Sequence, residues 1–385
     1  MLLIKNGTLI IGTGSIGKGD LLIDGGKIIK TGKNLKADDR TKVLDAEGKF
    51  VTPGLIDVHT HLGIHEEGIG LAGHDYNETS DPVTPYVRAI DGINPNEKGF
   101  EDARKAGVTT VQVMPGSANV IGGEMAVLKT AGIVIDQMVL RSPSGMKAAF
   151  GENPKRFYGS KGKTPVTRMG IAALFRKEMK RAQDYLRKLE NGEVIDFDLG
   201  AEQLINVLKG VIPIRAHAHR ADDIATTLRM AKEFNIEVTI EHCTEGHQIA
   251  SYIAEHNVRV SVGPTLSTRS KIELADKGWH TLNALDQAGV PVSITTDHPV
   301  VGIDSLILSA IAAVKHGLSE ETAWKAITIN AAKHLGVDER VGSLEPGKDA
   351  DVVVWSGDPF DARSTVEKTL INGETIYDSG ISSNK

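Results

Sequence analysis

The middle of the chain alternates between short apolar runs and segments with helical spacing, and no other feature of the sequence restricts the fold as strongly. Strands that alternate with helices predict a parallel sheet, because a parallel connection must be long enough to hold a helix. Apolar residues recur at helical spacing in 98–107, 175–192, 221–235, 245–257 and 281–289. The apolar runs are rich in Val and Ile, and they cover 54–62, 108–116, 132–140, 211–219, 236–243, 258–266 and 290–298.

About eight such units between residues 54 and 339 predict an α/β fold of the (β/α)8 type, a TIM-like barrel. An open, doubly wound sheet is the alternative interpretation of the same pattern. The two folds differ in where they collect functional side chains. A barrel brings residues from many strand ends to one face, whereas an open sheet binds its ligand in a single crevice.

The two ends of the chain have a different pattern from the middle. Residues 1–53 and 340–385 consist of short β-like runs separated by turn sequences such as Asn6-Gly7 and Asn372-Gly373. We expect these two segments to form one small composite β-sandwich domain. Residues 54–339 then form the barrel, which we expect to be the catalytic domain.

Charge, cysteine content and hydropathy exclude several classes of function. The net charge of −6 gives no sign of a nucleic-acid-binding protein, which would need a basic patch. Cys243 is the only cysteine, as is typical of proteins from a reducing compartment. No apolar stretch approaches the ~20 residues that span a bilayer. We therefore expect a cytoplasmic protein with a small-molecule substrate and no nucleic-acid or membrane partner.

Histidines stand at the predicted ends of several strands. His59 and His61 are two residues apart, so both imidazoles lie on the same face of a strand. Neutral imidazole is the commonest metal ligand among side chains. A lone Asp at a strand end often has a different role, because it caps the following helix. In a barrel, the active site lies where the strands end. Later predicted strand ends carry His217, His219, His242 and Asp297.

These strand-end residues and the string VTPGLIDVHTHLG, residues 51–63, resemble the amidohydrolase superfamily. The likeness is closest to its imidazolonepropionase- and prolidase-related branch. It covers nearly the whole chain, because the β-like ends resemble the composite β domain that flanks such barrels. The resemblance implies metal-dependent hydrolysis of an amide-type C–N bond in an N-acyl amino acid, a dipeptide or a cyclic amide. A homo-oligomer is also expected from the resemblance.

The resemblance further implies the roles of individual residues. One or two divalent cations, Zn first with Mn, Fe or Co as alternatives, would activate a water molecule. Asp297 would also serve as the acid and base, and His242 would polarise the carbonyl group. The implied metal ligands are His59, His61, His217, His242 and Asp297.

A ligand that bridges two metals is less clear from the sequence. In two-metal members of the superfamily this ligand is often a carboxylated lysine near the third or fourth strand. Lys147 lies in a short apolar context at a plausible fourth strand end, and Glu124 follows a Gly-Gly pair near the third. We favour Lys147 over Glu124, and a site with a single metal and neither residue stays open.

Two stretches are candidates for substrate binding. Residues 63–95 show no helical or strand periodicity, and a loop of this length inside a domain is usually functional or disordered. Arginines near strand ends can hold a carboxylate, although they form salt bridges at a barrel edge as readily. The candidate substrate-binding residues are His65, Tyr76, His219, Arg220, Thr265 and Arg269.

Two other functions are weighed against hydrolysis of an amide. Deaminases of the superfamily usually carry a glutamate three residues after the fifth-strand histidine, and Arg220 stands at that position after His217. A non-catalytic scaffold of the same fold would be expected to lose metal ligands. This chain keeps every one of the core ligands, so both alternatives are less favoured.

Overall fold

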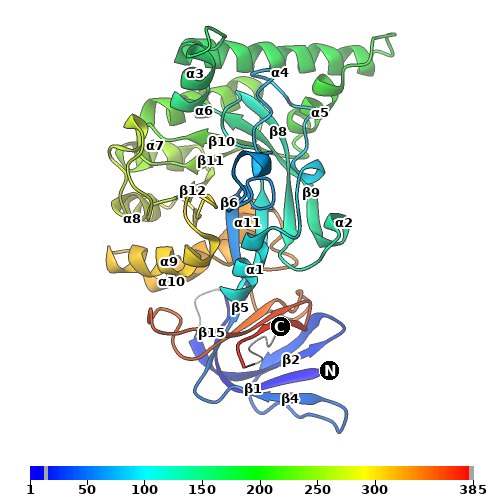
Figure 1. The fold of residues 1–385 in the computed structure, drawn as a ribbon, viewed down its shortest axis with the longest axis vertical. Coiled ribbons are helices and arrows are strands. Elements are labelled where there is room, and N and C mark those ends of the chain that lie inside the picture. Colours follow the sequence, from blue (N-terminus) through cyan, green and yellow to red (C-terminus); the bar gives the residue numbers. More distant parts are fainter. Residues whose placement is uncertain (13–15, 381–385) are drawn as a thin grey trace.

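The computed structural model describes residues 1–12 and 16–380. Two sheets organise these residues, and Figure 1 shows them one above the other. The upper sheet carries the central part of the chain and is surrounded by helices. The lower sheet contains both labelled chain ends, the N-terminal strands in blue and the C-terminal strands in orange and red.

Eight strands form the barrel sheet, in the order β13-β12-β11-β10-β9-β8-β7-β6. Its two edges meet, because Thr60 bridges His298 in parallel and the His61 amide donates to the His298 carbonyl at 2.8 Å. The predicted barrel is thus confirmed. The strands are β6 (Leu55–Thr60), β7 (Val108–Val113), β8 (Ile121–Lys129), β9 (Val139–Ala149), β10 (Ile214–Ala218), β11 (Val238–His242), β12 (Arg259–Val262) and β13 (Val292–Ile294).

The third barrel strand departs from the regular strand–helix alternation. β8 runs antiparallel to both β7 and β9, while the other barrel pairs are parallel. Residues 114–120 form too short a connection for a parallel crossover, so the chain turns back beside β7. The strand predicted at 132–140 is wrong, because residues 135–138 form helix α2 and β9 begins only at Val139.

Helices pack on the outside of the barrel, as α6 does on β10 and β11. Their starts follow capping chemistry: Thr167 caps α4 and Asp198 caps α5 by accepting an amide of the first turn. The helices are α1 (Lys98–Lys105), α2 (Ile135–Met138), α3 (Glu152–Gly159), α4 (Arg168–Glu190), α5 (Leu199–Leu208), α6 (Ala221–Phe234), α7 (Ala250–Glu255), α8 (His280–Gln287), α9 (Leu306–Lys315), α10 (Glu320–Ala326) and α11 (Ile329–Leu335), with 3-10 turns η1 (Gly70–Gly73), η2 (Ala89–Asp91), η3 (Gly246–Ile249), η4 (Ile272–Leu274) and η5 (Ile303–Ser305).

The second sheet is mixed and contains strands from both ends of the chain. Its order is β16-β15-β14-β5-β1-β2-β3, with β4 paired to β1. The N-terminal β5 pairs antiparallel with the C-terminal β14, so the composite β domain is confirmed. Residues 13–15 and 381–385 of the predicted domain lie outside the described residues. The strands are β1 (Leu2–Ile10), β2 (Ile16–Asp24), β3 (Lys27–Gly32), β4 (Lys42–Asp45), β5 (Phe50–Pro53), β14 (Val352–Trp355), β15 (Val366–Ile371) and β16 (Glu374–Asp378).

Polar side chains inside the barrel hold its closing strands together. The buried carboxylate of Asp57, on β6, accepts hydrogen bonds of 2.6 Å from the hydroxyls of Thr295 and Thr296, just after β13. Buried polar groups need such partners, because water is not available to them. Asp57 therefore positions the segment that carries Asp297 directly beside the end of β6.

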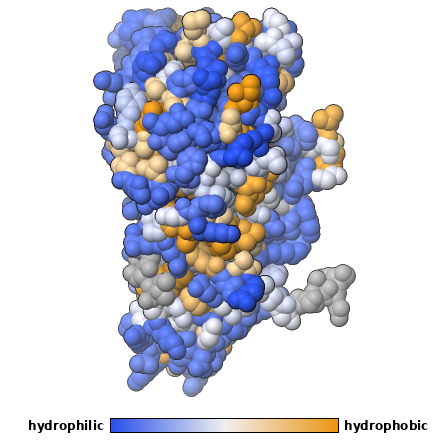
Figure 2. Space-filling model, turned by 90° about the vertical axis from the view of Figure 1, so that its left-hand side faces the viewer, coloured by the Kyte–Doolittle hydropathy of each residue, from blue (hydrophilic) through white to orange (hydrophobic). Residues whose placement is uncertain are grey.

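The face of the molecule drawn in Figure 2 is predominantly hydrophilic. Figure 2 shows one side of the molecule, on which blue residues dominate and orange, apolar residues appear in smaller groups. Among the residues that the structure describes, no helix is long and apolar enough to cross a membrane.

Candidate metal centre

Two histidines at the end of β6 have their rings held in the same way. The Nδ1 atom of His59 lies 3.3 Å from the Glu241 carboxylate, and Nδ1 of His61 lies 2.8 Å from the Met114 carbonyl oxygen. An ionised carboxylate and a carbonyl oxygen can only accept, so each Nδ1 carries the proton and donates it. Each Nε2 atom is therefore a free lone pair, which is the arrangement of a metal-binding imidazole.

The side chains of His242 and Asp297 point toward this pair of histidines because both residues have a left-handed backbone conformation. Their φ angles are 71° and 55°, a region that residues other than glycine rarely adopt. Neighbouring residues of a strand normally face opposite sides, yet Glu241 contacts His59 and the His242 ring also lies 4.6 Å from the His59 ring. The turn at His242 thus lets two consecutive side chains face the barrel interior. Backbone strain of this kind is concentrated at functional sites.

The atoms that point toward one another in this group, the histidine Nε2 atoms and a carboxylate oxygen, are hydrogen-bond acceptors. The His242 Nδ1 atom donates to the Gly263 carbonyl at 2.8 Å, which leaves its Nε2 free as well. Oδ1 of Asp297 lies 3.4 Å from Nε2 of His59 and 3.3 Å from Nε2 of His61. Ligand atoms of His59, His242 and Asp297 lie within 4.8 Å of one another. Lone pairs at these distances repel one another unless a cation lies between them, so the residues fit a divalent metal.

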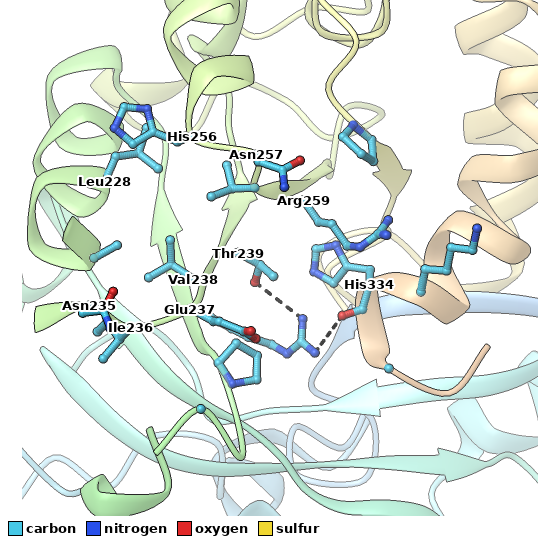
Figure 3. A pocket seen from close by; sticks show the side chains of 18 of the residues that line it. Leu228, Asn235, Ile236, Glu237, Val238, Thr239, His256, Asn257, Arg259 and His334 are labelled. Atoms are coloured by element: carbon cyan, nitrogen blue, oxygen red, sulfur yellow. Dashed lines mark hydrogen bonds between the residues drawn. The ribbon is translucent and has the colours of Figure 1, made fainter. Parts of the chain in front are cut away.

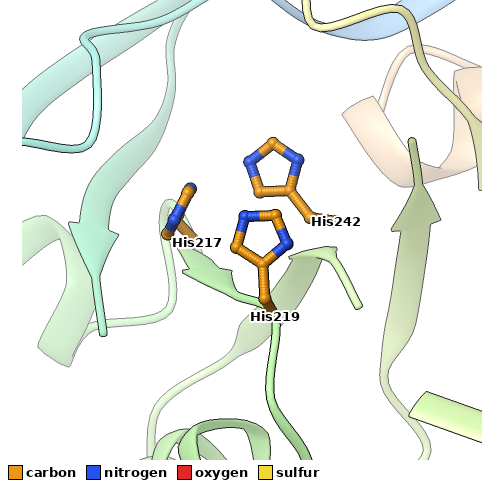
Figure 4. A group of neighbouring side chains, drawn as sticks. All are labelled: His217, His219 and His242. Atoms are coloured by element: carbon orange, nitrogen blue, oxygen red, sulfur yellow. The ribbon is translucent and has the colours of Figure 1, made fainter. Parts of the chain in front are cut away.

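A second group shares His242 and adds His217 of β10 and His219, which follows this strand. Figure 4 shows the rings of His217, His219 and His242 turned toward one another, and their ligand atoms lie within 4.8 Å. The ring centroids of His217 and His242 are 4.5 Å apart, and those of His219 and His242 are 4.6 Å apart. His219 was expected to bind substrate, whereas the structure places it in a group that could hold a metal. The reason is strand alternation, which turns His217 and His219 to the same face.

Burial keeps these imidazoles in the form that binds metals. It lowers the pKa of His59 to about 3, and it lowers the pKa values of His217 and His219 to well below the ordinary value. Burial raises the pKa of Asp297, but the surrounding imidazoles more than reverse this effect and leave the pKa below its usual value. At neutral pH the group therefore combines neutral histidines with an ionised carboxylate.

Lys147, on β9, reaches the same group from the barrel wall. Its side chain is fully buried, and its Nζ lies 3.3 Å from Nε2 of His59 and 3.0 Å from Sδ of Met114. Burial lowers the pKa of this amine to about 8. A substantial fraction of the amine is then neutral and nucleophilic near physiological pH.

Glu124, the rival bridging residue, lies on the other face of the sheet. In the antiparallel pair of β8 and β9, Gly123 lies opposite Lys147 and Glu124 lies opposite Met146. Residues that face each other across strands point to the same side, and neighbours along a strand point to opposite sides. The expectation that Glu124 contributes to the site therefore fails, because its side chain points away from Lys147 and toward the charge of Arg88.

A cavity of about 870 Å³ opens above these residues. Its wall includes parts of the long loop after β6, where the rings of His65 and Tyr76 stack with centroids 4.3 Å apart. Most other wall residues belong to the segment after β12 and to α3. The lining residues besides the histidines and Asp297 include Asn77, Ser117, Asn153, Arg156, Phe157, Leu266, Ser267, Thr268 and Lys271.

Comparison with known proteins decides the family. The model of the amidohydrolase family matches residues 50–376, which is most of the chain and includes the whole barrel. The chain belongs to the amidohydrolase family. The resemblance to this family found in the sequence is thereby confirmed, and imidazolonepropionases and prolidase structures are among the proteins that the chain is similar to.

Three amidohydrolase relatives show how far the similarity extends. A crystal structure of an amidohydrolase from Thermotoga maritima is 43% identical, with a TM-score of 0.96 over 98% of this chain and 100% of that one. Amidohydrolase tasK of Hapsidospora irregularis is 31% identical over 94% of this chain, which spans only 40% of the length of that protein. Imidazolonepropionase of Thermoplasma volcanium is 24% identical over 93% of this chain and 90% of its own. The chain is thus a family hydrolase that acts on C–N bonds.

Three residues predicted to bind substrate do not line the amidohydrolase cavity. Arg220, just before α6, is half-buried, and its guanidinium donates to Asp222 at 2.9 and 3.0 Å. Arg269 donates to the carbonyl oxygens of Ala275 and Lys277 and so holds its own loop together. Thr265 is not among the cavity-lining residues. Both arginines follow strand ends, as predicted, but their guanidinium groups bind neighbouring groups of the protein.

Sequence reasoning missed a polar group beside His217. Asn153 lies with its Nδ2 atom 3.4 Å from Nε2 of His217, and its Oδ1 accepts from Lys271 at 3.0 Å. The buried carboxylate of Glu273 pairs with Lys271 at 2.6 Å and lies 3.7 Å from both His217 and His219. Asn153 lies in the short helix α3, and Lys271 and Glu273 lie at the 3-10 turn η4, so no strand periodicity in the sequence could have indicated them.

A second cavity, of about 690 Å³, lies at the opposite end of the barrel strands. Figure 3 shows part of its wall, including Thr239 and His334. The guanidinium of Arg215 donates to the Thr239 hydroxyl and to the carbonyl oxygen of His334. The residues around it stand at the starts of β10, β11 and β12. Active sites of barrels lie at the other end, where the histidines are.

Proposed function

We propose that this amidohydrolase binds one or two divalent cations, Zn first, and hydrolyses an amide-type C–N bond of a small molecule. Candidate substrates are N-acyl amino acids, dipeptides and cyclic amides. One observation carries the proposal: the Nε2 lone pairs of His59, His61 and His242 converge on the Asp297 carboxylate at the base of a cavity. The proposed ligands are His59, His61, His217, His242 and Asp297, with Lys147 as a bridging ligand.

The roles of the side chains follow from their positions. A bound divalent cation supplies the Lewis acidity that lets water lose a proton near neutral pH. Oδ1 of Asp297 faces His59 and His61, so its other oxygen is left to accept the proton of the attacking water. The same carboxyl group then returns the proton to the leaving nitrogen. Burial of the imidazoles keeps them from competing for that proton.

The cavity wall supports a substrate with a carboxylate. Arg156 lines the cavity with a largely exposed guanidinium, and such a group binds carboxylates, whereas Lys271 beside it is already paired with Glu273. Phe157 and Leu266 supply apolar surface beside them. A cavity of about 870 Å³ is within the range that holds small molecules. N-acyl amino acids and dipeptides combine a carboxylate with an amide bond, so they come first in a screen.

The proposal is tested by metal analysis and a substrate screen on protein purified without chelators. We expect stoichiometric divalent metal, loss of that metal in a His59→Ala/His61→Ala variant, and turnover of at least one amide in the three substrate classes. A His256→Ala variant, changed at the half-buried residue that follows α7, serves as the control. Absence of stoichiometric metal from the wild-type protein would refute the proposal. Release of ammonia from aminated rings, with no amide cleaved, would replace it with deamination.

The proposed role of Lys147 makes a separate prediction. Its neutral amine can add to carbon dioxide, forming one N–C bond and releasing one proton, and the product is a carbamate that can bridge two cations. Lys147→Ala is expected to lose one of the two metals and to lower kcat/KM at least about a hundredfold, because a metal ligand is removed. Metal counting and steady-state kinetics check this.

Rescue separates this role from a purely structural one. A short carboxylate such as acetate or propionate can occupy the space left in Lys147→Ala and restore part of the activity. The exposed Lys209, at the end of α5, gives the matched control variant Lys209→Ala. Full activity and unchanged metal content in Lys147→Ala would show that the site works without this side chain.

A further inference from the structure

A second group of metal-binding side chains lies outside the amidohydrolase site, on the surface. His247 belongs to η3, Asp276 follows η4, and His280 is the first residue of α8. Their ligand atoms lie within 4.8 Å of one another. Nε2 of His247 is 3.0 Å from Oδ2 of Asp276 and 3.4 Å from Nε2 of His280.

The hydrogen bonds around His247 determine which of its nitrogens carries a proton. The hydroxyl of Thr281 donates to the carbonyl oxygen of Thr244 at 3.0 Å. Its oxygen must therefore accept from Nδ1 of His247, which lies 2.9 Å away. Nδ1 holds the proton, and Nε2 of the neutral ring is a lone pair. A ring oriented by such a partner is typical of a metal ligand.

Nε2 of His247 then faces a carboxylate oxygen and a second imidazole nitrogen. Oδ2 of Asp276 carries negative charge and already accepts from Gln248 at 3.0 Å. Nε2 of His280 faces the same point from α8. Bonds of 2.0–2.1 Å to one central ion place neighbouring ligands about 2.9 to 3.4 Å apart. The observed separations of 3.0 and 3.4 Å match this range.

We propose that His247, Asp276 and His280 form a second metal site, specific for a transition-metal dication such as Zn²⁺, Co²⁺ or Ni²⁺. Two imidazoles and one carboxylate suit these ions, whereas Mg²⁺ and Ca²⁺ prefer oxygen ligands alone. His247 is half-buried, while Asp276 and His280 are exposed, so water completes the coordination. The site is separate from the barrel site, because none of the three residues lines the amidohydrolase cavity.

An ion bound at this second site would restrain the motion of one wall of the cavity. The segment 264–279 leaves β12, forms part of the wall with Leu266, Ser267 and Lys271, and carries Glu273 beside His217. Asp276 and His280 stand at the far end of this segment, and His247 follows β11, which ends at His242. Metal binding at this second site would therefore connect the segment 264–279, which lines the cavity, to the residues that follow β11, the strand that carries the proposed ligand His242.

A protonated His247 would satisfy the same contacts without a metal. Its Nε2–H would then be shared between Asp276 and His280, and the protein would bind no additional ion. The experiment compares these two cases. Wild-type protein, His280→Ala and His256→Ala are stripped with a chelator, titrated with Zn²⁺ alone, and analysed by calorimetry and by metal content after gel filtration. His256 is a matched control, because it is a half-buried histidine, like His247, at the end of α7, and its Nδ1 bonds to the carbonyl of Tyr252.

We expect His280→Ala to hold one equivalent of Zn²⁺ fewer than the wild-type protein, and His256→Ala to match the wild type. Loss of a direct ligand weakens binding at the site at least about tenfold, since even the partner of a ligand contributes that much. The comparison does not depend on how fully the barrel site reloads, because that site is the same in all three proteins. Equal Zn²⁺ content and affinity in wild type and His280→Ala would overturn the proposal.

Hydrogen exchange tests, independently of activity, whether metal binding restrains the segment 264–279. Zn²⁺ should slow amide exchange within 264–279 in the wild-type protein and in His256→Ala, but not in His280→Ala. Slowing of equal size in all three proteins would show that the barrel site alone orders the segment. That result would refute the structural role assigned to the second site.

Discussion

Asp297→Asn is expected to lower kcat/KM at least about a thousandfold, because it removes the group that moves the proton and one anionic metal ligand. Asn has nearly the same shape, so the contacts around the side chain are retained. It also tolerates the left-handed backbone of this position, where φ is 55°. The loss is therefore chemical, and circular dichroism and the thermal midpoint should show an intact fold.

The matched control for this variant is Asp184→Asn, which changes an exposed carboxylate on α4 in contact with Arg187 and Lys188. We expect its kcat/KM to stay within about twofold of the wild type, because exposed ion pairs contribute little. An Asp297→Asn variant that retained activity within about tenfold would contradict the assigned role. Catalysis would then depend on another base among the residues that line the cavity.

The histidines at the strand ends were predictable because a strand alternates with a period of two. The spacing of His59 and His61, and of His217 and His219, places each pair on one face of its strand. Barrel topology brings those faces together at one end. The sequence also suggested a place for Lys147 on the fourth strand, and the structure puts this side chain beside His59.

The parts of the site that escaped prediction depend on backbone turns and long-range contacts. The left-handed turn at His242 allows both Glu241 and His242 to face inward, and no pattern of alternating residues indicates such a turn. Lys271 and Glu273 come from an irregular loop whose path depends on the whole barrel. The antiparallel course of β8 follows from a short connection, which the sequence pattern alone does not distinguish from a parallel crossover.

Beneath the proposed metal site, Glu241 connects the proposed ligand His59 to a buried polar network. Its carboxylate lies 3.3 Å from Nδ1 of His59, and it accepts from Ser261 at 2.5 Å and from Nε2 of His334 at 3.0 Å. Burial raises the pKa of Glu241, but the neighbouring histidines lower it by more, so the carboxylate stays ionised. Its charge also balances the buried guanidinium of Arg215.

Glu241→Gln is therefore expected to reduce the free energy of unfolding by about 3–5 kcal/mol, the usual result of leaving a buried charge uncompensated. The amide keeps the shape of the side chain but leaves Arg215 without a counter-charge. It also weakens the orientation of His59, so metal affinity should fall about 10- to 100-fold. Denaturant unfolding of the metal-free protein and metal titration of the folded protein measure the two effects separately.

A double-mutant cycle distinguishes the charge effect from simple loss of packing. Arg215→Met removes the buried cation, so Glu241→Gln should cost much less in that background than in the wild type. Metal affinity should stay low in the double variant, because the partner of His59 is still altered. The control is Glu237→Gln, at an exposed position just before the same strand. Equal costs of Glu241→Gln in both backgrounds would show that Arg215 does not depend on this carboxylate, and the network would then act on the metal site through His59 alone.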